Sequence, residues 1–255
     1  MLLACACIVG AVVGSFVNVC IWRLPAGESI VSPPSHCPHC GNHIRAYDNI
    51  PILSYLLLGG RCRACRTRIS ARYPAVEALT AAGFALVAHQ FGPTPEAAAA
   101  ALFLAALIVI SFIDLDHQII PDVISLPGIV VGLLLAVVGV GPSWRDSVLG
   151  LLLGGGTLWA VAAGYQALTG REGMGGGDIK LLAMVGAFIG WRGVLVTLMI
   201  GSFSGAAVGI ALMIARGTDS RLPIPFGPFL ALGAACGLFF GDTAINWYLG
   251  VALYH

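Results

Sequence analysis

Charged residues are scarce in this sequence of 255 residues. Only 10% of them are charged, whereas a soluble domain carries about 25%. Hydrophobic residues make up 58% of the chain, and the mean hydropathy is +0.91. The shortage of charge excludes an ordinary soluble domain and predicts a chain that lies mostly within a lipid bilayer.

The features of a cleaved signal peptide are also missing from the first apolar run. Its nearest positive charge, Arg23, follows the run instead of preceding it, and no small-residue cleavage site comes after it. We therefore expect this run to be a transmembrane helix. Seven runs have roughly the 17–25 residues that a span needs, namely 2–22, 75–91, 97–114, 122–140, 146–168, 193–215 and 227–250.

An eighth apolar run, 178–190, is short. It can span only where the bilayer is thin or where protein surrounds it, or it is partly re-entrant. The fold class predicted is an all-α polytopic membrane protein with about eight transmembrane helices, one of them short. The predicted parts are a first helix (1–22), a cytoplasmic four-cysteine domain (23–74) and a membrane-embedded core (75–255).

Basic residues are distributed unevenly between the two sides of this topology. Seven arginines lie in residues 23–74, namely Arg23, Arg45, Arg61, Arg63, Arg66, Arg68 and Arg72. Alternation puts four more on the same side, Arg171, Lys180, Arg216 and Arg221, and leaves Arg145 and Arg192 on the other. The positive-inside rule then predicts that residues 23–74 are cytoplasmic and both termini are periplasmic.

Residues 23–74 contain two C-x-x-C pairs. Cys37 and Cys40 form the first, Cys62 and Cys65 the second, and 21 residues separate the pairs. Four thiolates at this spacing predict a tetrahedral Zn site, structural because all four ligands come from protein. Two disulfides or four free thiols are the alternatives, and a reducing cytosol disfavours disulfides. The other cysteines lie in apolar runs and are simplest as small core residues: Cys5, Cys7, Cys20 and Cys236.

Carboxylates occur where apolar runs begin and end. Asp114 ends one run and Asp178 begins the short one, both on the cytoplasmic side. If helix packing brings them together they share one proton, which provides a general acid and a general base. A helix N-cap is the alternative for Asp178, and an interfacial charge that reaches water is the alternative for Asp114. Asp116 faces elsewhere on a continued helix, and Asp122 looks like a helix-start residue.

Seven segments, in order over the whole chain, carry a family resemblance. They are GSFVNVCIWRLP (14–25), the two cysteine pairs, NIPILSYLLLGGRC (49–62), ISARYPAVE (69–77), IDLDHQIIPD (113–122), GMGGGDIKLL (173–182) and PFGPFLALG (225–233). Together they resemble the bacterial type IV prepilin peptidases, intramembrane aspartyl proteases of the GxGD kind. Carried over residue by residue, the catalytic pair falls on Asp114 and Asp178. The resemblance, and not periodicity, chooses Asp114 over its neighbours.

The resemblance also implies an activity. Members of this family cleave the positively charged leader from prepilins and pseudopilins after a glycine, at the cytoplasmic face of the bacterial inner membrane. Most members with the four-cysteine domain then methylate the new N-terminus, usually phenylalanine, with S-adenosylmethionine. The complete domain here implies both activities, with prepilins, pseudopilins and the lipid bilayer as partners and no nucleic acid.

Three glycines, Gly175, Gly176 and Gly177, precede Asp178. Glycine allows backbone geometries that other residues avoid, leaves room for a substrate strand, and lets a loop move. We expect a substrate-positioning loop here, in addition to the turn that the chain needs in any case.

The site for the methyl donor has no clear motif, because the sequence lacks a glycine-rich Rossmann turn. Candidates at the membrane edge are Arg72, Tyr73 and Glu77. Each has a simpler interpretation, respectively a positive-inside anchor, an interfacial aromatic residue and a salt-bridge partner.

Other functions are compatible with parts of the sequence. A polytopic transporter also uses short broken helices and intramembrane acids, but the acids here lie at the membrane edge and no repeat of two halves is evident. A nucleic-acid module would explain the arginines of residues 23–74, which the positive-inside bias already explains. A peptidase without methylase activity also stays open.

Overall fold

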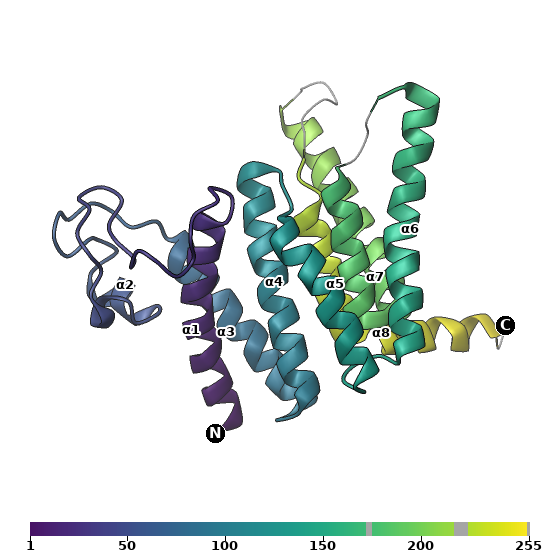
Figure 1. The fold of residues 1–255 in the computed structure, drawn as a ribbon, viewed down its shortest axis with the longest axis horizontal. Coiled ribbons are helices and arrows are strands. Elements are labelled where there is room, and N and C mark those ends of the chain that lie inside the picture. The colour runs from purple at the N-terminus through teal and green to yellow at the C-terminus, as the bar shows by residue number, and fades with distance from the viewer. Residues whose placement is uncertain (172–174, 217–223, 254–255) are drawn as a thin grey trace. The chain divides into compact units, whose positions relative to one another are not determined.

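The computed structural model describes residues 1–171, 175–216 and 224–253 (Figure 1). These residues form α-helices and one short 3-10 helix, in the order α1 (Leu2–Arg23), η1 (Ala46–Asp48), α2 (Leu53–Leu57), α3 (Arg72–Phe91), α4 (Pro95–His117), α5 (Asp122–Val137), α6 (Trp144–Thr169), α7 (Gly176–Arg216) and α8 (Gly227–Leu253). No β-strand occurs in the described parts of the chain, which confirms the predicted all-α class. Arg221, predicted to be cytoplasmic, lies outside the described residues.

Five of the described helices are long and apolar enough to cross a membrane: α1, α4, α6, α7 and α8. The apolar helix α5 is shorter, with 16 residues, and α3 is not in this set. The protein is therefore an all-helical polytopic membrane protein.

Helix α7 is broken at Gly190. This residue has φ 68° and ψ −179°, which is not helical, so α7 consists of two helices that meet there. The break falls between the two apolar runs 178–190 and 193–215, and it confirms the prediction of a short helix after the glycines. Glycine is needed at this point because its φ lies in a region that other residues rarely adopt.

The chain divides into two compact units, residues 1–109 and 110–255, and the boundary falls within α4. In the first unit, α1 and α3 approach closely at two glycines of α1. A Cβ atom on Gly10 would lie 2.8 Å from Cα of Ala81, and one on Gly14 would lie 2.7 Å from Cα of Glu77. Small residues four apart allow this approach between membrane helices.

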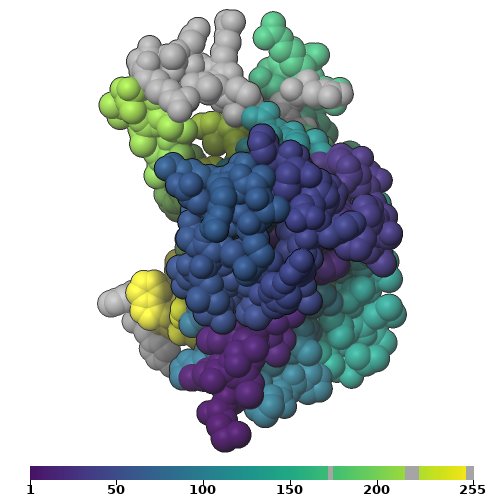
Figure 2. Space-filling model, turned by 90° about the vertical axis from the view of Figure 1, so that its left-hand side faces the viewer, coloured from purple at the N-terminus to yellow at the C-terminus, as the bar shows by residue number. Residues whose placement is uncertain are grey.

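The segment between α1 and α3 is fastened to the C-terminal end of α1. The buried guanidinium of Arg23 donates hydrogen bonds to the carbonyl oxygens of Ser29, at 2.8 Å, and Pro33, at 2.7 Å. The segment lies beside the C-terminal half of α1, and the N-terminal half of that helix extends beyond it (Figures 1 and 2). The arginine that follows the first apolar run thus has a structural use as well as a place in the charge pattern.

In the second unit, α7 packs against α5, α6 and α8 (Figure 1). Its residues Leu181, Leu182, Met184 and Val185 are fully buried. The contact with α6 is close because a Cβ atom on Gly186 would lie only 2.1 Å from the carbonyl oxygen of Gly150. This packing holds the start of α7 against the neighbouring helices of the unit.

Candidate functional site

Two aspartates that are far apart in sequence line one cavity of the second unit. The cavity has a volume of about 270 Å³ and is partly open. It is lined by Asp114, Gln118, Ile119, Ile120, Asp122, Gly175, Gly177 and Asp178. The end of α4, the start of α5 and the start of α7 therefore contribute to one site.

Asp114 lies in the last turn of α4 and is only 5% exposed. Its Oδ2 atom accepts a hydrogen bond of 2.9 Å from the backbone N–H of Gly227, the first residue of α8. The helix ends soon after, where Gln118 takes a positive φ of 56°. The carboxylate is therefore held inside the unit and is not an interfacial charge that reaches freely into water.

Asp178 lies in the first turn of α7, where its backbone N–H bonds the carbonyl oxygen of Gly175 at 3.3 Å. Its carboxylate is half-buried and near enough to that of Asp114 for the two charges to repel each other. Two carboxylates in such a site oppose each other's ionisation, which is what the predicted acid–base pair requires.

Asp122 also lines the cavity, and its role there was not predicted from the sequence. It begins α5, as expected of a helix-start residue, and its two carboxylate oxygens lie 2.7 and 2.8 Å from Nζ of Lys180. This pair joins the starts of α5 and α7 beside the cavity. No local sequence signal points to it, because the two residues are 58 positions apart.

Two of the glycines before Asp178, Gly176 and Gly177, do not have a positive φ. A Cβ atom on Gly177, however, would lie 2.9 Å from Cβ of Ile120, in the connection between α4 and α5. Gly177 is thus a point of close approach between two walls of the cavity.

The four cysteines of the C-x-x-C pairs form one cluster in the first unit. Their sulfur atoms all lie within 4.8 Å of one another, and the sulfurs of Cys37 and Cys65 are 3.8 Å apart. A tetrahedral Zn site with Zn–S bonds of about 2.3 Å has sulfurs about 3.8 Å apart. All the cysteines are free thiols, so the disulfide alternative is wrong, and the cluster has the dimensions of a metal site.

The two cysteine pairs lie on matching turns. The first turn has hydrogen bonds from Gly41 N to Cys37 O (2.8 Å) and from Cys37 N to Asn42 O (2.9 Å). The second repeats them from Arg66 N to Cys62 O (3.0 Å) and from Cys62 N to Thr67 O (2.9 Å). Each turn has one positive φ, at Gly41 and at Arg66. Such turns aim both sulfurs of a pair toward one point, as a metal knuckle requires.

Hydrogen bonds to sulfur favour thiolates at two of the four positions. The backbone N–H groups of Cys40 and His39 lower the pKa of Cys37. The hydroxyl and then the backbone N–H of Thr67 lower the pKa of Cys65 to about 6. At Cys40 the N–H of Asn42 acts in the same direction, but desolvation and the neighbouring thiols outweigh it and raise the pKa to about 11. The surrounding hydrogen bonds therefore favour the thiolate form at Cys37 and Cys65.

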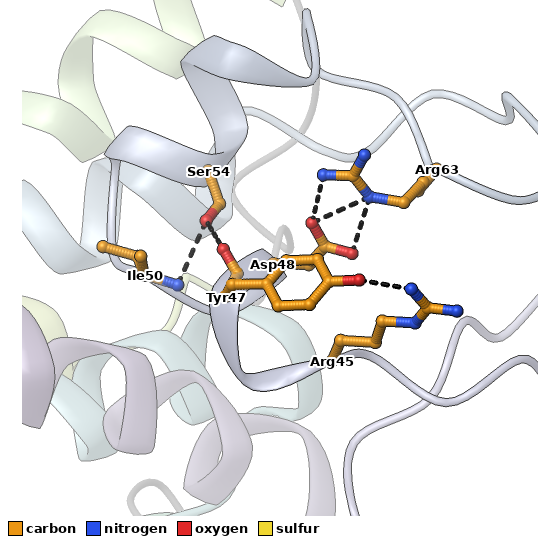
Figure 3. Close-up of polar contacts among 6 residues, drawn as sticks. All are labelled: Arg45, Tyr47, Asp48, Ile50, Ser54 and Arg63. Atoms are coloured by element: carbon orange, nitrogen blue, oxygen red, sulfur yellow. Dashed lines mark hydrogen bonds and ion pairs between the residues drawn. The ribbon is translucent and has the colours of Figure 1, made fainter.

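Between the cysteine pairs lies a polar cluster that the sequence reasoning missed (Figure 3). Arg63 donates from Nε and Nη2 to the carboxylate of Asp48, with distances of 2.6–3.0 Å, and this bond lowers the pKa of Asp48. Arg45 donates to the hydroxyl of Tyr47, and Ser54 donates to the carbonyl oxygen of Tyr47 at 2.9 Å. These bonds tie the loop before α2 to the second cysteine turn.

The candidate residues for the methyl donor lie at the start of α3. Glu77 is buried, and its Oε2 accepts a hydrogen bond of 2.7 Å from the backbone N–H of Ile52, a residue with φ 60°. Tyr73 is 40% exposed, and its carbonyl oxygen accepts from Asn18 of α1. Arg72 is half-exposed. Glu77 thus fastens the start of α2, whereas Tyr73 is exposed and Arg72 is partly exposed.

Two models of known protein families match this chain. The bacterial peptidase A24 N-terminal domain matches residues 8–91, and the type IV leader peptidase family matches residues 101–210. No solved structure was found to match.

Three relatives are each named prepilin leader peptidase/N-methyltransferase. The protein from Pseudomonas aeruginosa is 40% identical, and the match covers 97% of this chain and 93% of the relative. The one from Aeromonas hydrophila is 41% identical (93% and 90%), and the one from Stutzerimonas stutzeri is 39% identical (97% and 94%). With two family domains and such identity over nearly its whole length, the chain belongs to the type IV leader peptidase family.

Proposed function

We propose that this protein removes the leader peptide from type IV prepilins and pseudopilins and then N-methylates the new N-terminal residue. One observation carries the peptidase proposal: Asp114 of α4 and Asp178 of α7 line a single cavity. The names of the relatives support both activities. A transporter is not favoured, because the two acids meet at helix ends in one partly open cavity.

The proposed cleavage uses the two carboxylates and one water. The ionised carboxylate takes a proton from the water as its oxygen attacks the carbonyl carbon of the scissile bond. The protonated carboxylate gives its proton to the carbonyl oxygen. When the tetrahedral intermediate collapses, the C–N bond breaks and the leaving amine takes up a proton, so no covalent enzyme intermediate is needed.

The connection between α4 and α5 and the glycines before Asp178 form walls of the cavity in which this reaction occurs. Ile119, Ile120, Gly175 and Gly177 line the cavity beside the aspartates. A wall with little side-chain volume admits an extended substrate backbone, so we propose that the two glycines that line the cavity, Gly175 and Gly177, position the scissile bond.

We propose that Cys37, Cys40, Cys62 and Cys65 hold one structural Zn²⁺. The four sulfur ligands leave no open position for water, so the ion would fold the segment and would not catalyse the reaction. We also propose that residues 23–74 are the cytoplasmic zinc-binding domain and that residues 75–255 are the protease core.

S-adenosylmethionine would supply an electrophilic methyl group to the new N-terminal amine. Arg72, which is partly exposed, and Tyr73, which is exposed, are the candidates for its binding. Glu77 stays a candidate, but its contact with Ile52 supports a structural role.

The protein is an inner-membrane protein, as its apolar helices and its relatives indicate. For its orientation we propose that both termini are periplasmic and that residues 23–74 and both aspartates are cytoplasmic. The charge pattern supports this, since Arg23 ends α1 and Lys180 lies near the start of α7. Arg145, near the start of α6, and Arg192, just after the break at Gly190, fall on the predicted periplasmic side.

A purified-protein assay tests both activities. The protein is mixed with a prepilin peptide that carries a Gly–Phe bond and with S-adenosylmethionine, and products are weighed by mass spectrometry. We expect a peptide shortened after glycine and heavier by one methyl group. An uncut peptide from folded protein would refute the peptidase, and cut but unmethylated peptide would leave the peptidase alone.

A further inference from the structure

We propose that Gly227, at the start of α8, is a positioning residue for cleavage because its backbone N–H fixes the carboxylate of Asp114. This inference rests on the proposed function of Asp114 as half of the catalytic pair. The contact is direct, since the N–H of Gly227 lies 2.9 Å from Oδ2 of Asp114 and both residues are buried.

The first turn of α8 leaves this N–H available for the aspartate. Helices begin with N–H groups that have no partner inside the helix. In α8, the N–H groups of Phe229 and Leu230 both bond the carbonyl oxygen of Phe226, at 3.1 Å, and Pro228 has no N–H. Gly227 is thus the donor of this turn that reaches across to α4.

The absence of a side chain at residue 227 is what permits the contact. A Cβ atom there would lie 2.6 Å from Oδ2 of Asp114 and 3.1 Å from its Cγ. Any other residue would have to push the carboxylate, or the start of α8, out of place. The requirement is one of space, since Gly227 does not have a positive φ.

The contact has a consequence for the pair. An N–H donor stabilises the ionised form of the carboxylate that accepts from it, and the positive end of the α8 dipole acts in the same direction. It also occupies one acceptor site of Oδ2, which leaves Oδ1 the freer oxygen to act on water. Asp114 is then the charged member of the pair, oriented by α8 rather than by its own helix.

The test is the substitution Gly227→Ala in the full-length protein, assayed for cleavage of a prepilin peptide. A misplacement of catalytic atoms by about 1 Å lowers the rate about 100-fold. We expect a loss of about this size in kcat, with KM within about twofold, because the substrate walls contributed by α5 and α7 are untouched. Wild-type kcat in Gly227→Ala would overturn the proposal.

Two matched glycines separate positioning from packing. In Gly209→Ala the nearest atom to the new Cβ is Cδ1 of Ile224 at 3.5 Å, so wild-type cleavage is expected. In Gly233→Ala the new Cβ would lie 2.5 Å from the carbonyl oxygen of Thr197, which strains the packing of α8 on α7 away from Asp114. If Gly233→Ala lowers kcat as much as Gly227→Ala at equal loss of Tm, the effect is packing and the proposal fails.

A second comparison serves if Gly227→Ala does not fold. Asp114→Asn keeps an oxygen that can accept from Gly227, whereas Asp114→Ala leaves the buried N–H without a partner. We expect the Tm of Asp114→Ala to lie at least about 2 °C below that of Asp114→Asn, and equal Tm values would refute the contact. If Asp114→Asn cleaves normally, the proposed function fails. If it is inactive while Gly227→Ala is normal, only the positioning role fails.

Discussion

The substitution Gly177→Ala should impair cleavage, and the neighbouring substitution Gly176→Ala should not. At residue 177 a Cβ atom would lie 2.9 Å from Cβ of Ile120, whereas at residue 176 it would meet nothing within 4 Å. Carbon atoms in contact prefer about 3.5–4.0 Å, so the shortfall at residue 177 is about 0.6–1.1 Å. Either the α4–α5 connection or the start of α7, which carries Asp178, must move by that amount.

A displacement of this size is enough to matter at a catalytic pair. Misplacement by about 1 Å lowers a rate about 100-fold, and we expect kcat of Gly177→Ala to fall by that order. Gly176→Ala should keep wild-type kcat and gain up to about 1 kcal/mol in helix stability. The assay is cleavage of a prepilin peptide by purified protein, with the Tm of each variant as the control for folding.

A rescue experiment identifies the contact responsible. Because the nearest atom is Cβ of Ile120, the double variant Gly177→Ala with Ile120→Ala keeps the clash and should stay impaired. Gly177→Ala with Ile120→Gly removes that atom and should recover much of the rate. Equal rates in Gly176→Ala and Gly177→Ala, or rescue by Ile120→Ala as effective as by Ile120→Gly, would refute this reasoning.

Three further predictions concern the catalytic pair, the metal and the start of α2. Asp114→Asn and Asp178→Asn should each abolish cleavage, and the double variant should be no worse, because the pair acts as a unit. Methylation of a pre-cleaved peptide should survive in all three variants. Substantial cleavage by either single variant would exclude the mechanism. Purified protein should contain about one Zn per chain by elemental analysis. The Cys62→Ser variant should lose this metal, and its methylation activity should fall more than its cleavage activity. Equal metal content in both proteins would count against the site. Glu77→Ala should destabilise the protein by about 1–3 kcal/mol in unfolding experiments, because it leaves the N–H of Ile52 without its buried acceptor. Glu77→Gln keeps an oxygen at this position and should be more stable than Glu77→Ala. Equal stability of the two variants would contradict this role.

Much of the architecture could be predicted from the sequence because each membrane helix corresponds to a long apolar run. Apolar runs located the five long spans, and the gap between the runs 178–190 and 193–215 adjoins the break at Gly190. The cysteine spacing located the cluster, because a knuckle is built from residues close together in the chain. Local patterns suffice wherever the structure is local.

The candidate site could be predicted only in part. Nothing in the periodicity of α4 distinguishes Asp114 from Asp116, and it was resemblance that chose it. The contact from Gly227 to Asp114 joins residues 113 apart, so no local pattern reveals it. The glycines before Asp178 were expected to give backbone freedom and room for a substrate strand, but the close approach of Gly177 to Ile120 was not predicted. The distance between segments that are far apart in the chain depends on tertiary packing, so local sequence patterns do not predict it.

The site is assembled almost wholly from helix ends, and the chemistry explains why. Hydrolysis needs water, yet backbone groups within lipid must be paired inside their own helix. Only at helix ends do unpaired N–H groups and solvent occur together. The last turn of α4, the first turn of α7 and the first turn of α8 supply Asp114, Asp178 and the N–H of Gly227. Three helix ends in one unit thus form a polar, partly open site on an otherwise apolar protein, which is what a peptidase with a membrane-embedded substrate requires.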